Sequence, residues 1–129
     1  MRPHPRIIDR IIAGLQESRT ICVAGHIRTD GYCVGSKLGL TLALRNAGKQ
    51  VVCWNEDRIP QKYEFLDADG IIQKPMPGLE FDCVVAVDAA TFDRLGSVGQ
   101  YISRRKLFIN IDHHESNSRF ADLNWVSVR

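Results

Sequence analysis

The chain has 129 residues, of which 44% are hydrophobic and 25% are charged, a composition that is ordinary for one globular domain. Its formal net charge is only +2, because 17 basic side chains are scattered among 15 acidic ones. This balance excludes a broad basic footprint for nucleic acid, so any such contact must be local. We also expect no membrane span, because no apolar run approaches the ~18 residues that a span needs.

The first half of the sequence predicts two helices and two strands in alternation. Residues 6–15 place apolar side chains between charges at helical spacing, which indicates an amphipathic helix rather than a signal peptide. Residues 20–24 are a short apolar run closed by Gly25, as expected for a strand that is buried on both faces. A polar loop follows, and residues 32–47 then predict the second helix. Residues 50–54 predict the second strand.

The second half continues the alternation of strands and helices. It predicts a short helix, a weak strand, a strong strand, a helix, a strand and an edge strand at residues 59–66, 71–72, 81–88, 97–104, 106–111 and 120–128. Strands separated by helices predict an α/β fold with a mainly parallel, twisted, Rossmann-like sheet and helices on both faces. We interpret residues 1–129 as belonging to one such domain.

The four cysteines show no C-x-x-C spacing, and three of them fall in predicted strands: Cys22, Cys53 and Cys83, with Cys33 in a helix. We therefore expect buried free thiols that act as small hydrophobic side chains. Free thiols point to a reducing, cytoplasmic location.

Side chains that bind divalent metals follow three predicted strands: His26 and Asp30, then Asp88, then Asp112, His113 and His114. If the strands are parallel, these groups meet at one edge of the sheet, where open α/β sheets bind their ligands. Carboxylate and imidazole ligands without a thiolate favour manganese, magnesium or iron over a structural zinc site. Each group alone also fits a turn, a helix cap or a surface pair, so only their joint placement predicts a metal centre.

Three motifs in chain order contain these residues. Residues 25–36, GHIRTDGYCVGS, contain a His, an Asp four residues later and a Gly-Ser pair that opens a helix. Residues 87–88 with 94–96 form the second motif, and residues 110–117, NIDHHESN, form the third. Together they resemble the motifs of the DHH family of phosphoesterases, which is named after the third.

Two further segments, 59–66 and 119–126, resemble the branch of this family that contains oligoribonucleases and phosphatases of 3′-phosphoadenosine 5′-phosphate. The resemblance implies metal-dependent hydrolysis of phosphate esters in nucleotides or short single-stranded oligonucleotides. It implies two metal ions, usually manganese with magnesium as the alternative. A homodimer is an assembly that it allows.

The resemblance also implies a ligand set. One ion would be held by His26, Asp30 and Asp88, and Asp88 would bridge to a second ion that His113 also binds. The chain departs from the family at Tyr32, where the first motif has a second Asp. A phenol with a usual pKa near ~10 is a poor ligand for manganese at neutral pH, so we expect the first ion to bind better than the second.

The expected catalytic residues are Asp112 and His114. Asp112 would orient His113 by fixing which ring nitrogen faces the metal. His114 would face the substrate phosphate, with Asn117 as a further substrate-binding residue. The family's C-terminal substrate-binding domain would lie beyond Arg129, so we expect a partial, truncated DHH domain.

Two other functions compete with this interpretation. A nucleotide-cofactor binder of the Rossmann type is disfavoured, because residues 31–35 do not spell G-x-G-x-x-G and residues 35–37 do not complete a P-loop. A non-catalytic fragment or pseudoenzyme that keeps one metal site and serves as a binding module remains open, because of Tyr32 and the early end of the chain.

Overall fold

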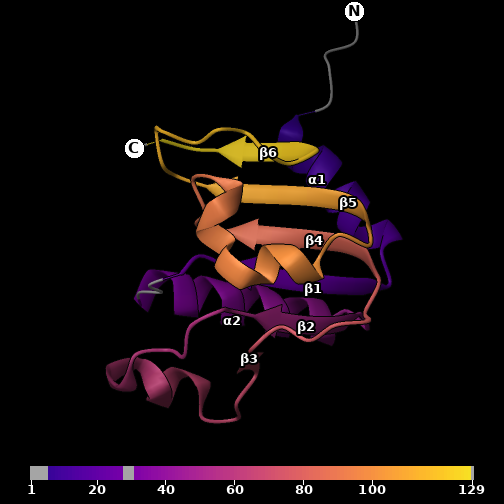
Figure 1. Ribbon diagram of the computed structural model, residues 1–129. Helices are drawn as coiled ribbons and strands as arrows, with labels where there is room; N and C mark the ends of the chain where they lie inside the picture. The colour runs from indigo at the N-terminus through magenta and orange to yellow at the C-terminus, as the bar shows by residue number, and fades with distance from the viewer. Residues whose placement is uncertain (1–5, 28–30, 129) are drawn as a thin grey trace, which may run out of the picture.

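A computed structural model describes residues 6–27 and 31–128, without the side chains of residues 31 and 32. Its strands are β1 (Thr20–Gly25), β2 (Gln50–Trp54), β3 (Ile72–Gln73), β4 (Phe81–Val87), β5 (Arg105–Asp112) and β6 (Leu123–Val126). They form one sheet in the order β3-β2-β1-β4-β5-β6 (Figure 1). Every neighbouring pair is parallel, which confirms the predicted α/β fold.

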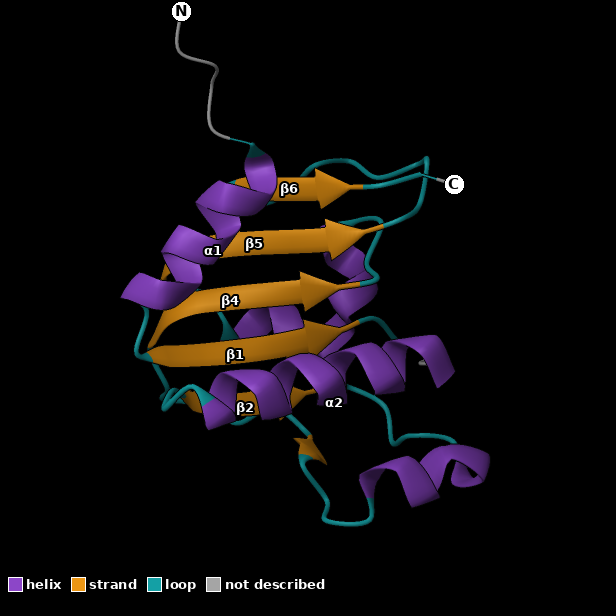
Figure 2. Cartoon of the chain, turned by 180° about the vertical axis from the view of Figure 1, so that it is seen from behind, coloured by secondary structure: helices purple, strands orange, loops and turns teal. Residues whose placement is uncertain are grey.

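Helices cover both faces of this sheet. They are α1 (Ile7–Glu17), α2 (Gly31–Asn46) and the 3₁₀ segment η2 (Phe92–Tyr101), while a further 3₁₀ segment, η1 (Gln61–Asp67), lies beyond β3. Seen from behind, α1 and α2 lie across one face while η2 lies on the other (Figure 2). The predicted helix at 97–104 was misplaced, because η2 is two 3₁₀ pieces joined at the non-helical Gly96, which interrupts the helical spacing.

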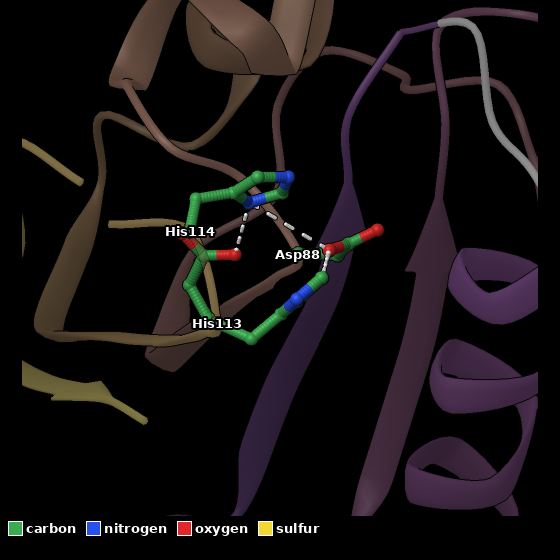
Figure 3. A group of neighbouring side chains, drawn as sticks. Asp88, His113 and His114 are labelled. Carbon is green, nitrogen blue, oxygen red and sulfur yellow. Dashed lines mark hydrogen bonds and ion pairs between the residues drawn. The ribbon is translucent and has the colours of Figure 1, made fainter. Parts of the chain in front are cut away.

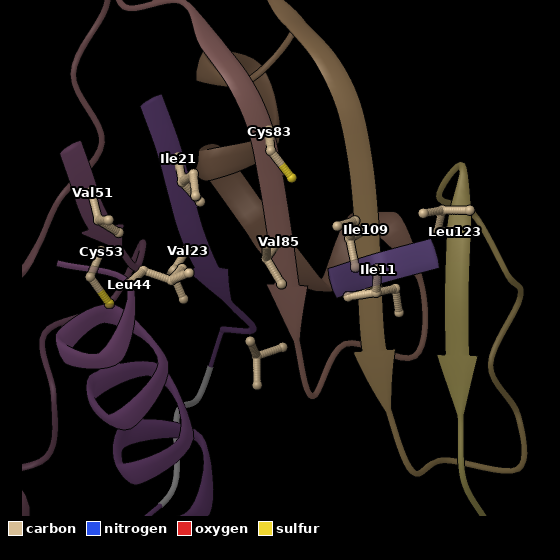
Figure 4. Close-up of a cluster of buried hydrophobic side chains, with 11 residues drawn as sticks. Ile11, Ile21, Val23, Leu44, Val51, Cys53, Cys83, Val85, Ile109 and Leu123 are labelled. Carbon is tan, nitrogen blue, oxygen red and sulfur yellow. The ribbon is translucent and has the colours of Figure 1, made fainter. Parts of the chain in front are cut away.

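Side chains that alternate along the strands fill two apolar layers, so the sheet is buried on both faces. The layer under α1 and α2 contains strand residues such as Val23, Val85 and Ile109, with Ile11 and Leu44 from the helices (Figure 4). The layer under η2 contains alternate residues of the same strands, together with aromatic and aliphatic side chains of the η2 region. The two central strands, β1 and β4, are almost wholly buried, which fixes their register and the positions of their ends.

The strand order reverses between β1 and β4. After β1 the chain builds β2 and β3 on one side, and it then crosses to build β4, β5 and β6 on the other side. Ligands of such sheets bind beyond the carboxyl ends of the strands at this reversal. The fold therefore places the residues that follow β1 and β4 where a ligand site is expected.

All four cysteines are buried thiols outside any disulfide bond, as predicted from the sequence. Burial raises the pKa of the Cys83 thiol to about 12 and that of Cys22 well above its usual value, so both stay protonated and unreactive. Among the described helices, none has the length and apolar character needed to cross a membrane.

Candidate metal centre

The register of the sheet aligns the ends of three adjacent strands. Gly25 of β1 lies beside Val87 of β4, and Val87 lies beside Ile111 of β5. The next residues along the three strands are His26, Asp88 and Asp112. Each strand thus delivers one metal-binding side chain to the same edge of the sheet.

Asp88 lies at the middle of this cluster. Its Oδ2 is 3.1 Å from His26 Nε2, and its Oδ1 is 2.6 Å from His113 Nε2. Nδ1 of His114 lies 3.8 Å from the same Oδ1. Figure 3 shows both imidazoles of the His113–His114 pair directed at this carboxylate. One carboxylate therefore connects the ends of β1, β4 and β5.

The backbone at Asp88 is held in an uncommon conformation. Its φ of 63° lies in the left-handed region, and its amide donates a hydrogen bond to the carbonyl of Ile111 at 2.9 Å. Non-glycine residues in this region concentrate at functional sites, because surrounding contacts must offset the strain. The turn after β4 is therefore fixed against β5, and the carboxylate is fixed with it.

Asp112 supports the second imidazole of the His-His pair. Its Oδ1 lies 2.6 Å from His114 Nδ1, and its Oδ2 accepts a hydrogen bond from Asn117 Nδ2 at 2.8 Å. The same amide group also donates to the carbonyl of Ala89. Asp112 is expected to orient His113, and its carboxylate contacts the ring of His114 in the structure, so its role toward His113 stays a prediction.

Titration behaviour follows from these contacts. The Asp88 carboxylate raises the pKa of His26 to about 10, although burial of the ring opposes this change. Burial alone would raise the pKa of Asp88, but hydrogen bonds from His26 and His113 outweigh it and lower the pKa. The pKa of Asp112 is likewise lowered, because hydrogen bonds from Asn117 and His114 outweigh the effect of burial. Both carboxylates are thus charged at neutral pH, as a cation site requires.

Cys33 is a neighbour of this centre that sequence reasoning missed. Its thiol, His26 and Asp88 place ligand atoms within 4.8 Å of one another, and all three side chains are buried. Gly25 makes room for it, because a Cβ on Gly25 would lie 2.8 Å from Cys33 Sγ. The sequence feature that could have identified Cys33 is its position in the first turn of α2, the helix that follows His26. A thiolate here would add a soft donor, which suits zinc better than manganese.

A second possible ligand group consists of Asp88, Asp112, His113 and His114, whose ligand atoms also lie within 4.8 Å of one another. The donor set of the described residues therefore fits divalent cations at Asp88. Asp30 lies outside the described residues, and so does the side chain of Tyr32. Their expected roles stay predictions.

Gly96 holds the loop that carries His26. Its φ of 59° and ψ of −137° form the kink in η2, where a Cβ would lie 2.5 Å from Ile27 Cγ2. The carbonyl of Arg94 accepts a hydrogen bond from the Ile27 amide at 2.7 Å, and the Ser97 amide donates to Glu56 Oε1 at 2.8 Å. The second sequence motif thus positions the first one.

Fold and site together define a Rossmann-like α/β domain with a candidate divalent-metal centre at its topological switch point. The model of the DHH family, N-terminal domain, matches residues 20–128. The chain belongs to this family.

Two relatives give the comparison its detail. The chain is 34% identical, over 134 aligned positions that cover 96% of it, to the bifunctional oligoribonuclease and PAP phosphatase NrnA of Thermus thermophilus. A solved structure of an exopolyphosphatase-related protein from Bacteroides fragilis superposes with a TM-score of 0.83 over 93% of the chain, at 20% identity. The chain spans 38% of the length of each of these two proteins.

Proposed function

We propose that this domain supplies the metal centre of a phosphoesterase that hydrolyses phosphate ester bonds in nucleotides or short single-stranded oligonucleotides. The observation that carries the proposal is the convergence of His26 and His113 on the two oxygens of Asp88. Family membership supports hydrolysis of phosphate esters in general, and the Thermus relative, an oligoribonuclease and PAP phosphatase, supports the substrate class.

His26, Asp88 and His113 would hold the cations, with Asp30 as a further ligand of the first ion. Nδ1 of His26 contacts the carbonyl of Ile27, so Nε2 is the nitrogen that faces Asp88 and would bind a metal. Bound manganese, or magnesium in its place, would convert a water to hydroxide at neutral pH and offset charge on the phosphoryl oxygens. Metal binding at His26 must displace the proton that the residue holds in the metal-free protein.

His114 and Asp112 would act on the substrate rather than on the metal. The Asp112 carboxylate holds Nδ1 of His114, which leaves Nε2 of this half-exposed ring free to donate to a phosphate oxygen. Asn117 fixes Asp112 from the other side and turns its own carbonyl oxygen to the amide of Arg119. We therefore assign Asn117 a supporting role beside the substrate, and Asp112 and His114 the catalytic ones.

The four buried free thiols agree with a cytoplasmic location, where thiols stay reduced. That the chain forms a homodimer remains a prediction, which a measurement of its molecular mass in solution would test.

The activity is tested with the full chain, manganese, and two substrates: adenosine 3′,5′-bisphosphate and a short oligoribonucleotide. We expect release of phosphate from the first or of mononucleotides from the second, and loss of both in chelator. Asp112→Asn should lower the rate by about 10- to 100-fold, because it removes the charge that holds His114. Metal and nucleotide binding without turnover would instead support the binding-module alternative. Titration with zinc beside manganese will show whether the Cys33 thiol joins the first site.

The second ion is tested by Tyr32→Asp, which restores the carboxylate that the family carries at this position. We expect a stoichiometry of about one manganese per wild-type chain, measured by calorimetry, and a second ion in the variant, because a charged oxygen ligand replaces a phenol. Hydrolysis should rise in parallel. If neither quantity changes, the second site is limited by ligands other than residue 32.

A further inference from the structure

A cleft of about 640 Å³ opens directly beside the metal centre. Its lining combines charged and titratable side chains, Asp88, Asp112 and His113, with apolar ones, Val87, Ile111 and Trp125. Such a mixed lining suits a ligand that has both a charged group and a flat apolar group. The proposed metal ligands account for the charged side chains and leave the apolar ones without an assigned role.

Trp125 is the aromatic side chain among the described residues that line this cleft. It lies on β6 and pairs with Ile111 of β5, one strand spacing of ~4.8 Å away. Asp112 is the residue that follows Ile111 on β5. Trp125 is 37% exposed. Trp54, by contrast, is 1% exposed and packs edge-on against Phe81.

The two tryptophans differ in their surroundings. Trp54 belongs to the core, whereas Trp125 lies on the edge strand β6 and lines the cleft. Exposure of a large ring costs free energy that its burial against a ligand would recover.

We propose that Trp125 is a stacking platform for the nucleobase of the substrate, next to the phosphate that cations at Asp88 and His113 would hold. The proposal rests on the proposed phosphoesterase function and adds to it the residue that recognises the base of the substrate. Stacking on an aromatic ring is tolerant of base identity, because every base has a π-face. The site should therefore distinguish nucleotides from base-free phosphates, such as inorganic polyphosphate, without selecting one base.

Binding tests this proposal without requiring turnover. With magnesium present, adenosine 5′-monophosphate should quench the indole emission of the wild-type chain, and ribose 5-phosphate should not. Trp125→Phe should abolish the quenching but keep the affinity within a few-fold, because a phenyl ring still stacks. Trp125→Ala should raise the Kd of adenosine 5′-monophosphate, measured by equilibrium dialysis, about tenfold. The Kd of ribose 5-phosphate should not change.

Two further variants keep the result interpretable. Phe65→Ala removes an aromatic side chain of η1 that is 75% exposed and does not line the cleft, and it should leave both affinities unchanged. Trp125→Leu keeps an apolar side chain on β6 and should weaken nucleotide binding as alanine does, even if alanine destabilises the edge strand.

Equal effects of Trp125→Ala on the two ligands, no effect on either, or no binding of adenosine 5′-monophosphate to the wild-type chain would each overturn the stacking role. Failure of the phosphoesterase function looks different, because the nucleotide would then bind through Trp125 without being hydrolysed.

Discussion

Replacement of Asp88 by asparagine is expected to abolish metal binding and, with it, metal-dependent hydrolysis. Each oxygen of Asp88 faces a different imidazole, and the side chain belongs to both candidate ligand groups. Mutation of a residue that only supports a metal ligand costs about 10- to 100-fold in metal affinity or activity. Loss of a ligand that both groups share should therefore cost more than about 100-fold. Calorimetric titration with manganese measures the first effect, and release of phosphate measures the second.

Asparagine is the suitable replacement, because it keeps the shape of the side chain and tolerates the φ of 63° at this position. The fold should therefore survive, as circular dichroism can check. Asp93→Asn, at the exposed start of η2, is the matched control and should bind manganese as the wild-type chain does. Manganese affinity that is unchanged in Asp88→Asn would remove the metal centre from this part of the molecule.

Gly96→Ala is expected to lower both the free energy of unfolding and the affinity for metal. The backbone angles at Gly96 disfavour any residue with a Cβ, at a cost of about 1–3 kcal/mol. The new methyl group would also lie 2.5 Å from Ile27 Cγ2 and 2.7 Å from Glu56 Cδ. Ile27 directly follows His26, so relief of this overlap must move the loop that carries the first metal ligand.

Gly39→Ala is the matched control for this prediction. Gly39 lies in α2, has no atoms within 4 Å of an added Cβ, and should give a gain of about 0.4–1 kcal/mol in stability without a change in metal binding. Thermal unfolding and manganese titration on both variants separate the two effects. A destabilised Gly96→Ala protein with wild-type metal affinity would show that the kink supports the fold and not the position of His26.

Local sequence patterns predicted most of the fold because each element carries its own periodic signal. The apolar run at 81–88 and the helical spacing at 32–47 correspond to β4 and α2 within a residue or two at their ends. The pattern failed at η2, where a glycine with positive φ joins two short 3₁₀ pieces and no regular repeat exists. Edge strand β6 is shorter than predicted, since pairing with a single neighbour limits its length.

By itself, the sequence determined the family, the parallel α/β class and the three groups of polar residues at strand ends. Only the tertiary structure decided how these groups combine: that His26 and His113 share Asp88, that Asp112 holds His114, and that Cys33 joins the first group. It also decided that Trp125 faces the cleft. The physical reason is that strand register and side-chain direction depend on contacts between residues far apart in the chain, which local periodicity does not encode.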